Sequence, residues 1–117
     1  AASTEIKIDR LLRSRISKEI PGLKTIAEAL GQSERQLRRA LKDDGRTYRE
    51  ILAKTRRDLC EEMLIEGELS LSEIADRLGY SEQSAFNRAF KDWFGATPKT
   101  YARAINIFNT AFDQLAP

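Results

Sequence analysis

The chain has 117 residues, which is enough for one domain or one tightly packed pair of subdomains. Hydrophobic residues make up 41% of the chain and charged residues 32%, proportions that are typical of a folded protein rather than a disordered one. The single cysteine rules out an internal disulfide framework, and no apolar run approaches the ~18 residues of a membrane span. These features predict a cytoplasmic protein with no membrane segment.

The residues needed for common enzymatic chemistry are scarce. Histidine, the most frequent acid–base catalyst and metal ligand, is absent. One cysteine cannot make a structural zinc site, and the chain has no glycine-rich phosphate-binding loop. Glu61 and Glu62 are available carboxylates, but we interpret them as the solvated face of a helix. We therefore expect no catalytic residue, no metal and no cofactor.

Charge is unevenly distributed along the chain, although the net charge is only +2. Residues 33–57 contain nine Lys and Arg against four Asp and Glu, whereas residues 58–69 contain five acidic residues and no basic one. A basic stretch is what an anionic partner such as a phosphate backbone requires. On charge alone, however, a solvated helix face is the simpler interpretation.

Apolar residues recur at helical spacing throughout, and no segment shows the alternation of a strand beside turn residues. The pattern predicts an all-α fold of about seven helices. In the last of them, Phe108 and Phe112 are expected to pack on the second half of the chain. In chain order, the predicted helices cover Thr4–Glu19, Leu23–Leu30, a helix capped by Ser33, Thr47–Ile65, a short helix capped by Ser70 or Ser72, a helix capped by Ser81, and a final helix that starts at Thr97-Pro98.

The sequence contains an internal repeat. The segment from Ile26 to Glu34 recurs 48 residues later, from Ile74 to Glu82, and after one inserted residue the apolar pattern of the following helix recurs as well. Each copy reads as a short helix, a glycine that permits positive φ, and a second helix. That arrangement is a helix-turn-helix, whose second helix can present polar side chains to base edges and phosphates. An ordinary helical hairpin would explain one copy, but two similar copies favour the helix-turn-helix.

The run from Leu71 to Tyr101 includes Ile74-Ala75, Leu78-Gly79-Tyr80-Ser81, Phe90-Lys91 and Phe94-Gly95-Ala96-Thr97-Pro98. Through this run the second copy resembles the signature of the AraC/XylS family of bacterial transcription regulators. The first copy and the intervening helix fit as well, so the resemblance covers about Leu23 to Tyr101. The chain departs from the family pattern at Cys60, where Ala is usual, and at Ala102, where Arg is usual; we interpret Cys60 as structural.

The resemblance implies a homeodomain-like fold with two helix-turn-helix subdomains joined by a long connecting helix. The expected divisions are residues 1–46 for the first subdomain, 47–66 for the connecting helix and 67–117 for the second subdomain with its C-terminal helix. The implied function is a sequence-specific transcription regulator, usually an activator, that inserts two recognition helices into consecutive major grooves. The implied partner is double-stranded DNA, and RNA polymerase is the one further partner that the resemblance suggests. The resemblance also implies an effector-binding or dimerisation domain ahead of this chain.

The residues expected to bind DNA lie mainly on the second helix of each copy. Arg matches guanine, and Asn or Gln matches adenine, through bidentate hydrogen bonds, whereas Lys and Ser more often meet phosphate. The expected base contacts are Arg35, Arg38, Arg39, Gln83, Ser84, Asn87 and Arg88, and the expected backbone contacts are Ser33, Gln36, Lys42, Ser81, Lys91, Thr97 and Lys99.

A helical protein-interaction adaptor without DNA binding is the alternative function. Helix-turn-helix folds also serve as adaptors, and the acidic stretch from Asp58 to Glu68 could meet a basic partner. DNA affinity with a steep salt dependence distinguishes the two functions, because only the regulator would show it.

Overall fold

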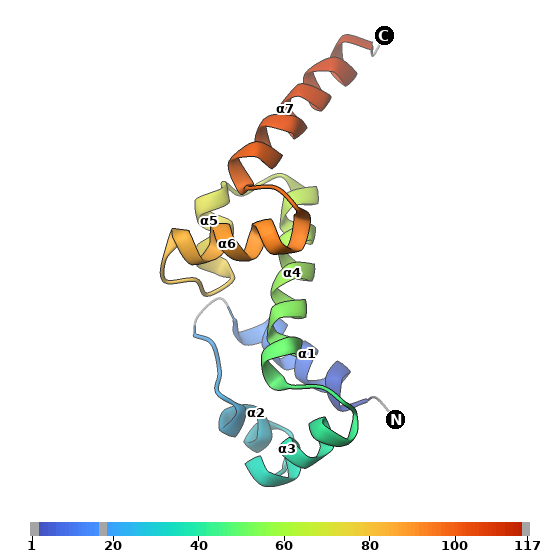
Figure 1. Ribbon diagram of the computed structural model, residues 1–117, viewed down its shortest axis with the longest axis vertical. Coiled ribbons are helices and arrows are strands. Elements are labelled where there is room, and N and C mark those ends of the chain that lie inside the picture. The colour runs from blue at the N-terminus through green and yellow to red at the C-terminus, as the bar shows by residue number, and fades with distance from the viewer. Residues whose placement is uncertain (1–2, 17–18, 116–117) are drawn as a thin grey trace. The chain divides into compact units, whose positions relative to one another are not determined.

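A computed structural model describes residues 3–16 and 19–115, apart from the side chains of residues 106–109 and 112. Seven helices, α1 to α7, occur in these residues and no strand does, so the prediction of an all-α fold is confirmed (Figure 1). Among these helices, none has both the length and the apolar character that crossing a membrane demands. The chain divides into two compact units, of which the first ends at Gly79 and the second begins at Tyr80.

Helix α1 (Thr4–Arg15) begins at Ser3, whose side chain accepts a hydrogen bond from the amide of Ile6, and ends at Ile16. The prediction of a helix as far as Glu19 is therefore wrong by about one turn; residues 17 and 18 lie outside the described range. The spacing of the apolar residues Ile16 and Ile20 predicted that the helix continues through both. Instead, both residues approach Gly79, which is a tertiary contact that helical periodicity cannot reveal.

The core of the first unit is apolar and lies between α1, α2 (Leu23–Ala29), α3 (Glu34–Asp43) and the start of α4 (Tyr48–Glu66). Each helix buries side chains at helical spacing, as the sequence pattern predicts. The buried residues of this core are Ile8, Leu12, Ile26, Ala27, Leu37, Leu41 and Ile51.

Helix α4 runs beside α1 over much of the length of α1 (Figure 1). Thr47 caps α4 through the amide of Glu50, and Gly67 ends it with a φ of 70°. The predicted bounds Thr47–Ile65 are thus confirmed to within one residue. The long helix follows from helix-favouring residues at most positions between a capping threonine and a glycine.

Helix α5 (Leu71–Arg77) begins at Ser70 rather than Ser72, which resolves the alternative left open by the sequence. Ser70 and Glu73 form a capping box: the Ser70 hydroxyl accepts from the amide of Glu73, and the Glu73 carboxylate accepts from the amide of Ser70. The hydrogen bond from the Ser70 backbone lowers the pKa of the Glu73 carboxyl, and an interaction with the Ser70 side chain lowers it further by a smaller amount.

The second unit contains α6 (Gln83–Phe94) and α7 (Pro98–Leu115), which starts at the proline as predicted. Its aromatic side chains contact one another: the ring centroids of Phe90 lie 4.7 Å from Phe94 and 5.5 Å from Tyr101. Phe86 and Phe90 are fully buried. The predicted packing of Phe108 and Phe112 falls on side chains outside the described range.

The cap of α6 differs from the predicted one. The N-cap residue is Glu82, without a side-chain hydrogen bond, rather than Ser81. Ser33, the N-cap of α3, therefore corresponds to Glu82 at an offset of 49 residues, although the sequence similarity pairs Ser33 with Ser81 at 48. The inserted residue accordingly lies in the turn before α6, and it moves the helix start one residue past the serine.

Candidate nucleic-acid interface

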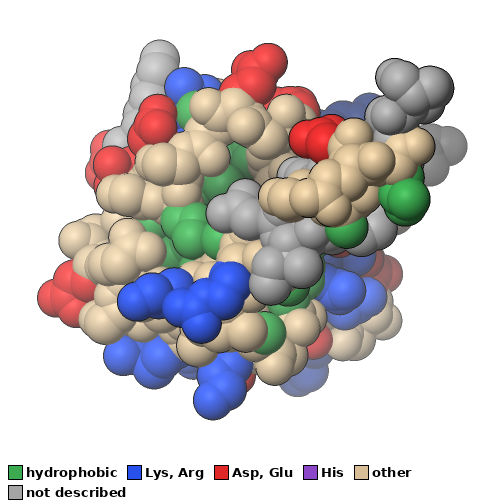
Figure 2. Space-filling model, turned by 90° about the horizontal axis from the view of Figure 1, so that it is seen from above, with side chains coloured by type: hydrophobic (Ala, Val, Ile, Leu, Met, Phe, Trp, Pro, Cys, Tyr) green, Lys and Arg blue, Asp and Glu red, His purple; other side chains and the backbone are tan. Residues whose placement is uncertain are grey.

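The second helix of each repeat, α3 or α6, has one buried and one exposed face. Leu37 and Leu41 are buried on α3, and Phe86 and Phe90 are buried on α6. Between them, Arg38 and Arg39 on α3 and Asn87 and Arg88 on α6 are exposed, and the alanine that follows each pair is half-buried. Each helix therefore has an apolar stripe that holds it in place and a polar face that remains available to a partner. Figure 2 shows Lys and Arg side chains exposed at the molecular surface.

All fourteen residues predicted to contact DNA are exposed. Because each of them lies outside the apolar core, none is needed to fill it, and each has access to a partner. The seven predicted base contacts, Arg35, Arg38, Arg39, Gln83, Ser84, Asn87 and Arg88, and the seven predicted backbone contacts, Ser33, Gln36, Lys42, Ser81, Lys91, Thr97 and Lys99, all belong to this exposed set.

The N-terminus of α3 is fixed by a reciprocal capping box. The Gln36 amide donates to the Ser33 hydroxyl over 3.1 Å, and the Ser33 amide donates to the Gln36 side-chain oxygen over 2.8 Å. These two side chains thus already serve the helix end. The other amides of the first turn have no partner within a helix, and together with the helix dipole they suit a phosphate group.

Three of the predicted base contacts, Arg38, Gln83 and Asn87, form side-chain contacts within their own helix. Arg38 forms an ion pair of 2.9 Å with Glu34 one turn earlier, yet 66% of the Arg38 side chain is exposed. On α6, the Gln83 side-chain amide donates to Asn87 over 3.2 Å. Such exposed contacts within a helix are weak, so they orient the side chains without preventing exchange for a base edge.

The chain enters α7 through Thr97, whose hydroxyl oxygen accepts from the Thr100 amide over 3.2 Å. Pro98, which follows Thr97, is buried, while Lys99 is exposed. This end of α7 therefore combines a capped helix start with an exposed lysine, the combination expected of a phosphate contact.

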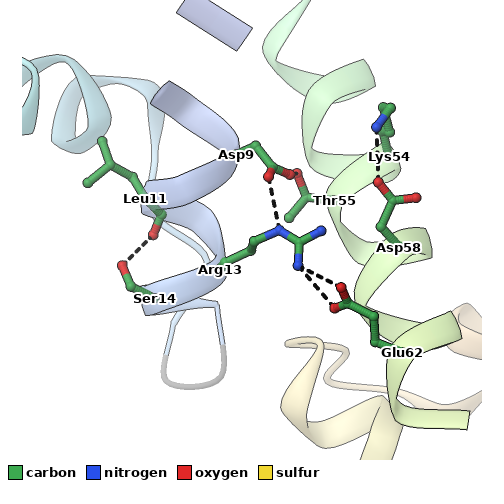
Figure 3. Close-up of polar contacts among 8 residues, drawn as sticks. All are labelled: Asp9, Leu11, Arg13, Ser14, Lys54, Thr55, Asp58 and Glu62. Atoms are coloured by element: carbon green, nitrogen blue, oxygen red, sulfur yellow. Dashed lines mark hydrogen bonds and ion pairs between the residues drawn. The ribbon is translucent and has the colours of Figure 1, made fainter. Parts of the chain in front are cut away.

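Several polar contacts between helices of the first unit could not be found from the sequence. Thr55 on α4 donates to Asp9 on α1 over 2.7 Å, and Arg13 pairs with both Asp9 and Glu62 (Figure 3). Arg56 donates to backbone carbonyls at the end of α5. Apart from the Asp9–Arg13 pair, whose members are four residues apart, these contacts join residues more than twenty positions apart, so no local motif indicates them.

Comparison with known proteins places these features in a family. A family model described as a helix-turn-helix domain matches residues 26–104. Over 98 residues the chain is 39% identical to the ornithine utilization regulator of Pseudomonas aeruginosa, covering 84% of this chain and 29% of that protein. Over 91 residues it is 35% identical to the HTH-type transcriptional regulator VqsM of the same species, covering 78% of this chain and 28% of that protein.

Solved structures agree with this result. The C-terminal domain of AraT, a response regulator from Geobacillus stearothermophilus, superposes with a TM-score of 0.72 at 31% identity, covering 88% of this chain and 86% of that one. A DNA-binding transcriptional dual regulator from Escherichia coli K-12 superposes with a TM-score of 0.82, covering 89% of this chain and 93% of that one. Its identity is only 22%, so this second likeness concerns the fold alone.

The fold and its two repeated helix pairs thus define a protein of the helix-turn-helix class. More particularly, the chain belongs to the AraC-type helix-turn-helix family, and the resemblance found in the sequence is confirmed. This family consists of DNA-binding regulators. The chain spans less than a third of the length of the two Pseudomonas relatives.

Proposed function

We propose that α3 and α6 are recognition helices that enter consecutive major grooves of one DNA site. The observation that supports this proposal most strongly is the division of both helices into a buried apolar stripe and an exposed polar face. An α-helix fits the major groove, where each base pair has a distinct pattern of donors and acceptors. Because the exposed residues of α3 and α6 differ, the target is an asymmetric site rather than a palindrome.

The base contacts in this proposal are side chains whose planar or small polar groups match base edges. On α3 they are Arg35, Arg38 and Arg39. On α6 they are Gln83, Ser84, Asn87 and Arg88. All of them are exposed, and arginine in particular pairs bidentately with guanine.

The backbone contacts surround the base contacts on the same helices and on the loops that enter them. Lys42 and Lys91 lie near the C-terminal ends of α3 and α6, and Thr97 and Lys99 lie at the start of α7. Ser33, Gln36 and Ser81 precede or begin the recognition helices. Contacts of this kind fix the register on the duplex and make binding depend on salt, without specifying a sequence.

The proposed division of labour assigns residues 1–46 and 67–117 to the two DNA-reading subdomains and residues 47–66 to the helix between them. Because the two Pseudomonas relatives are about three times as long as this chain, we place an effector-binding or dimerisation domain ahead of this segment in the complete regulator. The proposed setting is the cytoplasm, on nucleoid DNA. One chain of this length acts as a monomer, because it already carries both recognition helices.

An activating role would require a contact with RNA polymerase, and the acidic end of α4 is our candidate for it. Asp58, Glu61, Glu62 and Glu66 lie on this part of the helix, and 79% of the neighbouring Ile65 is exposed. An exposed apolar side chain among carboxylates suits a basic protein surface. The same surface would be the binding site if the chain were an adaptor.

Selection of binding sites from a random duplex pool tests the proposal. The proposed function predicts enrichment of one asymmetric site with two submotifs about 10–10.5 base pairs apart. It also predicts that log affinity falls linearly and steeply with log salt concentration. A single enriched submotif would show that only one helix reads bases. The absence of both enrichment and a salt slope would overturn DNA binding by this chain and favour the adaptor.

A further inference from the structure

Arg56 on α4 binds the C-terminal end of α5. Its Nε donates to the carbonyl oxygen of Leu78 over 2.9 Å, and its Nη2 lies 3.4 Å from the carbonyl oxygen of Gly79. Leu78 is the C-cap residue of α5. The last carbonyl oxygens of a helix accept no hydrogen bond from amides of the same helix. A cationic donor at this place therefore provides their missing partner and also complements the helix dipole.

Gly79 is held from a second side as well. A Cβ built on this glycine would lie 3.0 Å from Ile20 Cγ1 and 3.2 Å from the carbonyl oxygen of Ile16. In the first repeat, a Cβ on the corresponding Gly31 would meet nothing within 4 Å. The two turns are therefore built differently: the turn after α5 is packed against its surroundings, and the turn after α2 is open.

We propose that Arg56 is a positioning residue for the turn that leads into the second recognition helix. The inference rests on the proposed function, because it assigns Arg56 a role in how α6 reads DNA. The backbone that leads to α6 continues from Gly79, and Arg56 holds the carbonyls of Leu78 and Gly79 just before it. Releasing these carbonyls would give the turn before α6 more conformational freedom, and DNA binding by α6 would then have to restrict that turn at a cost in affinity.

The geometry requires an arginine. A guanidinium presents several donors in a rigid plane and can reach two adjacent carbonyls at once, whereas the ammonium of a lysine is a compact point donor on a flexible stem. Arg57, the next residue on α4, is exposed and provides a matched control, because Arg57→Ala removes the same charge from the same helix.

The test measures the affinity of wild type, Arg56→Ala, Arg56→Lys and Arg57→Ala for three duplexes. One duplex carries the selected site, and the other two have either submotif scrambled. We expect Arg56→Ala to reduce the affinity ratio between the intact site and the site with its α6 submotif scrambled by at least about tenfold, or 1.4 kcal/mol. The corresponding ratio for the α3 submotif should stay within about twofold in every variant, and Arg57→Ala should leave both ratios unchanged.

Arg56→Lys is expected to give an intermediate ratio for the α6 submotif, because the compact ammonium keeps the charge but cannot hold both carbonyls as the planar guanidinium does. Thermal unfolding followed by circular dichroism shows whether each variant is folded, and the lysine variant is decisive if the alanine variant is not. Equal losses for both submotifs, or unchanged ratios in folded Arg56 variants, would overturn the positioning role. If wild type itself distinguishes none of the duplexes, the proposed function fails rather than this inference.

Discussion

The Thr55 hydroxyl donates a hydrogen bond of 2.7 Å to the carboxylate of Asp9 and so joins the middle of α4 to α1. Thr55 is completely buried, and the same carboxylate also accepts from Arg13. Helix α1 lies outside the residues matched by the family model, yet its Ile8 and Leu12 belong to the buried core. The hydrogen bond therefore secures a helix on which the packing of the first unit depends.

Replacing Thr55 by valine keeps the shape of the side chain and removes the donor. We expect the free energy of unfolding to fall by about 1 kcal/mol, because Asp9 loses one partner but keeps Arg13. Urea denaturation measures the change. Thr25→Val, at an exposed position of α2, is the control and should change stability by less than about 0.5 kcal/mol. Equal effects of the two substitutions would contradict the importance of the hydrogen bond.

Alanine at the two repeat glycines should have unequal effects. Gly31 and Gly79 have φ values of 71° and 83°, so alanine at either should cost about 1–2 kcal/mol through the left-handed backbone. At Gly79 the added methyl also meets Ile20 and the carbonyl of Ile16, which should cost about 1–3 kcal/mol more. Melting temperatures of the two variants check the order. A smaller loss in Gly79→Ala than in Gly31→Ala would refute the close packing of this turn.

Arg38→Ala should separate DNA binding from folding. The Arg38–Glu34 pair is exposed, so its loss should cost no more than about 0.5 kcal/mol of stability. Affinity for the selected DNA should instead fall by about 1–3 kcal/mol, and the base preference at one position should relax.

We expect Arg88→Ala to lower DNA affinity in the same way and to relax the base preference at one position of the other submotif. Fluorescence anisotropy with cognate and random duplexes measures both losses. If either variant lost affinity equally on the two duplexes, that arginine would contact phosphate only.

The Cys60 thiol should be unreactive in the folded chain. Its side chain is completely buried, and burial, with a smaller effect of Glu61, raises the pKa of the thiol to about 12. At pH 8 we expect alkylation by iodoacetamide to be roughly a hundredfold or more slower than in urea, since the thiolate is the reactive form. Comparable rates in the two conditions would show that Cys60 is accessible.

The same shift makes a prediction about alkaline stability. In the unfolded chain the thiol loses its proton near pH 8.5, whereas in the folded chain it keeps the proton up to about pH 12. Ionisation therefore favours the unfolded chain, and the contribution of Cys60 to stability is present below pH 8.5 and is lost as the pH rises toward 12. Wild type should lose more stability over this range than Cys60→Ala, as measured by urea denaturation.

The sequence was informative wherever structure depends on local chemistry. The glycine after Leu30 and the glycine after Leu78 indicated the two turns. The threonine before α4 and the glycine after it indicated where that helix begins and ends. The exposed face of α3 and α6 could also be predicted, because the positions of Leu37 and Phe86 fix which side is buried.

Other features were beyond prediction because they depend on contacts between distant residues. Helix α1 ends before Ile20, which packs on Gly79 instead of continuing the helix. The repeat suggested Ser81 as a cap, but an inserted residue placed the cap at Glu82. Arg56 resembled any other basic residue of α4 until the structure placed the end of α5 beside it.

The central claim, two recognition helices reading consecutive major grooves, is tested most directly by changing the distance between the submotifs. Inserting five base pairs turns one submotif by about half a helical turn, to the other side of the duplex. The account predicts that affinity falls to that of a duplex with one submotif scrambled. Insertion of a full turn should recover part of the lost affinity, but not all of it. Unchanged affinity after the five-base-pair insertion would contradict simultaneous reading by α3 and α6.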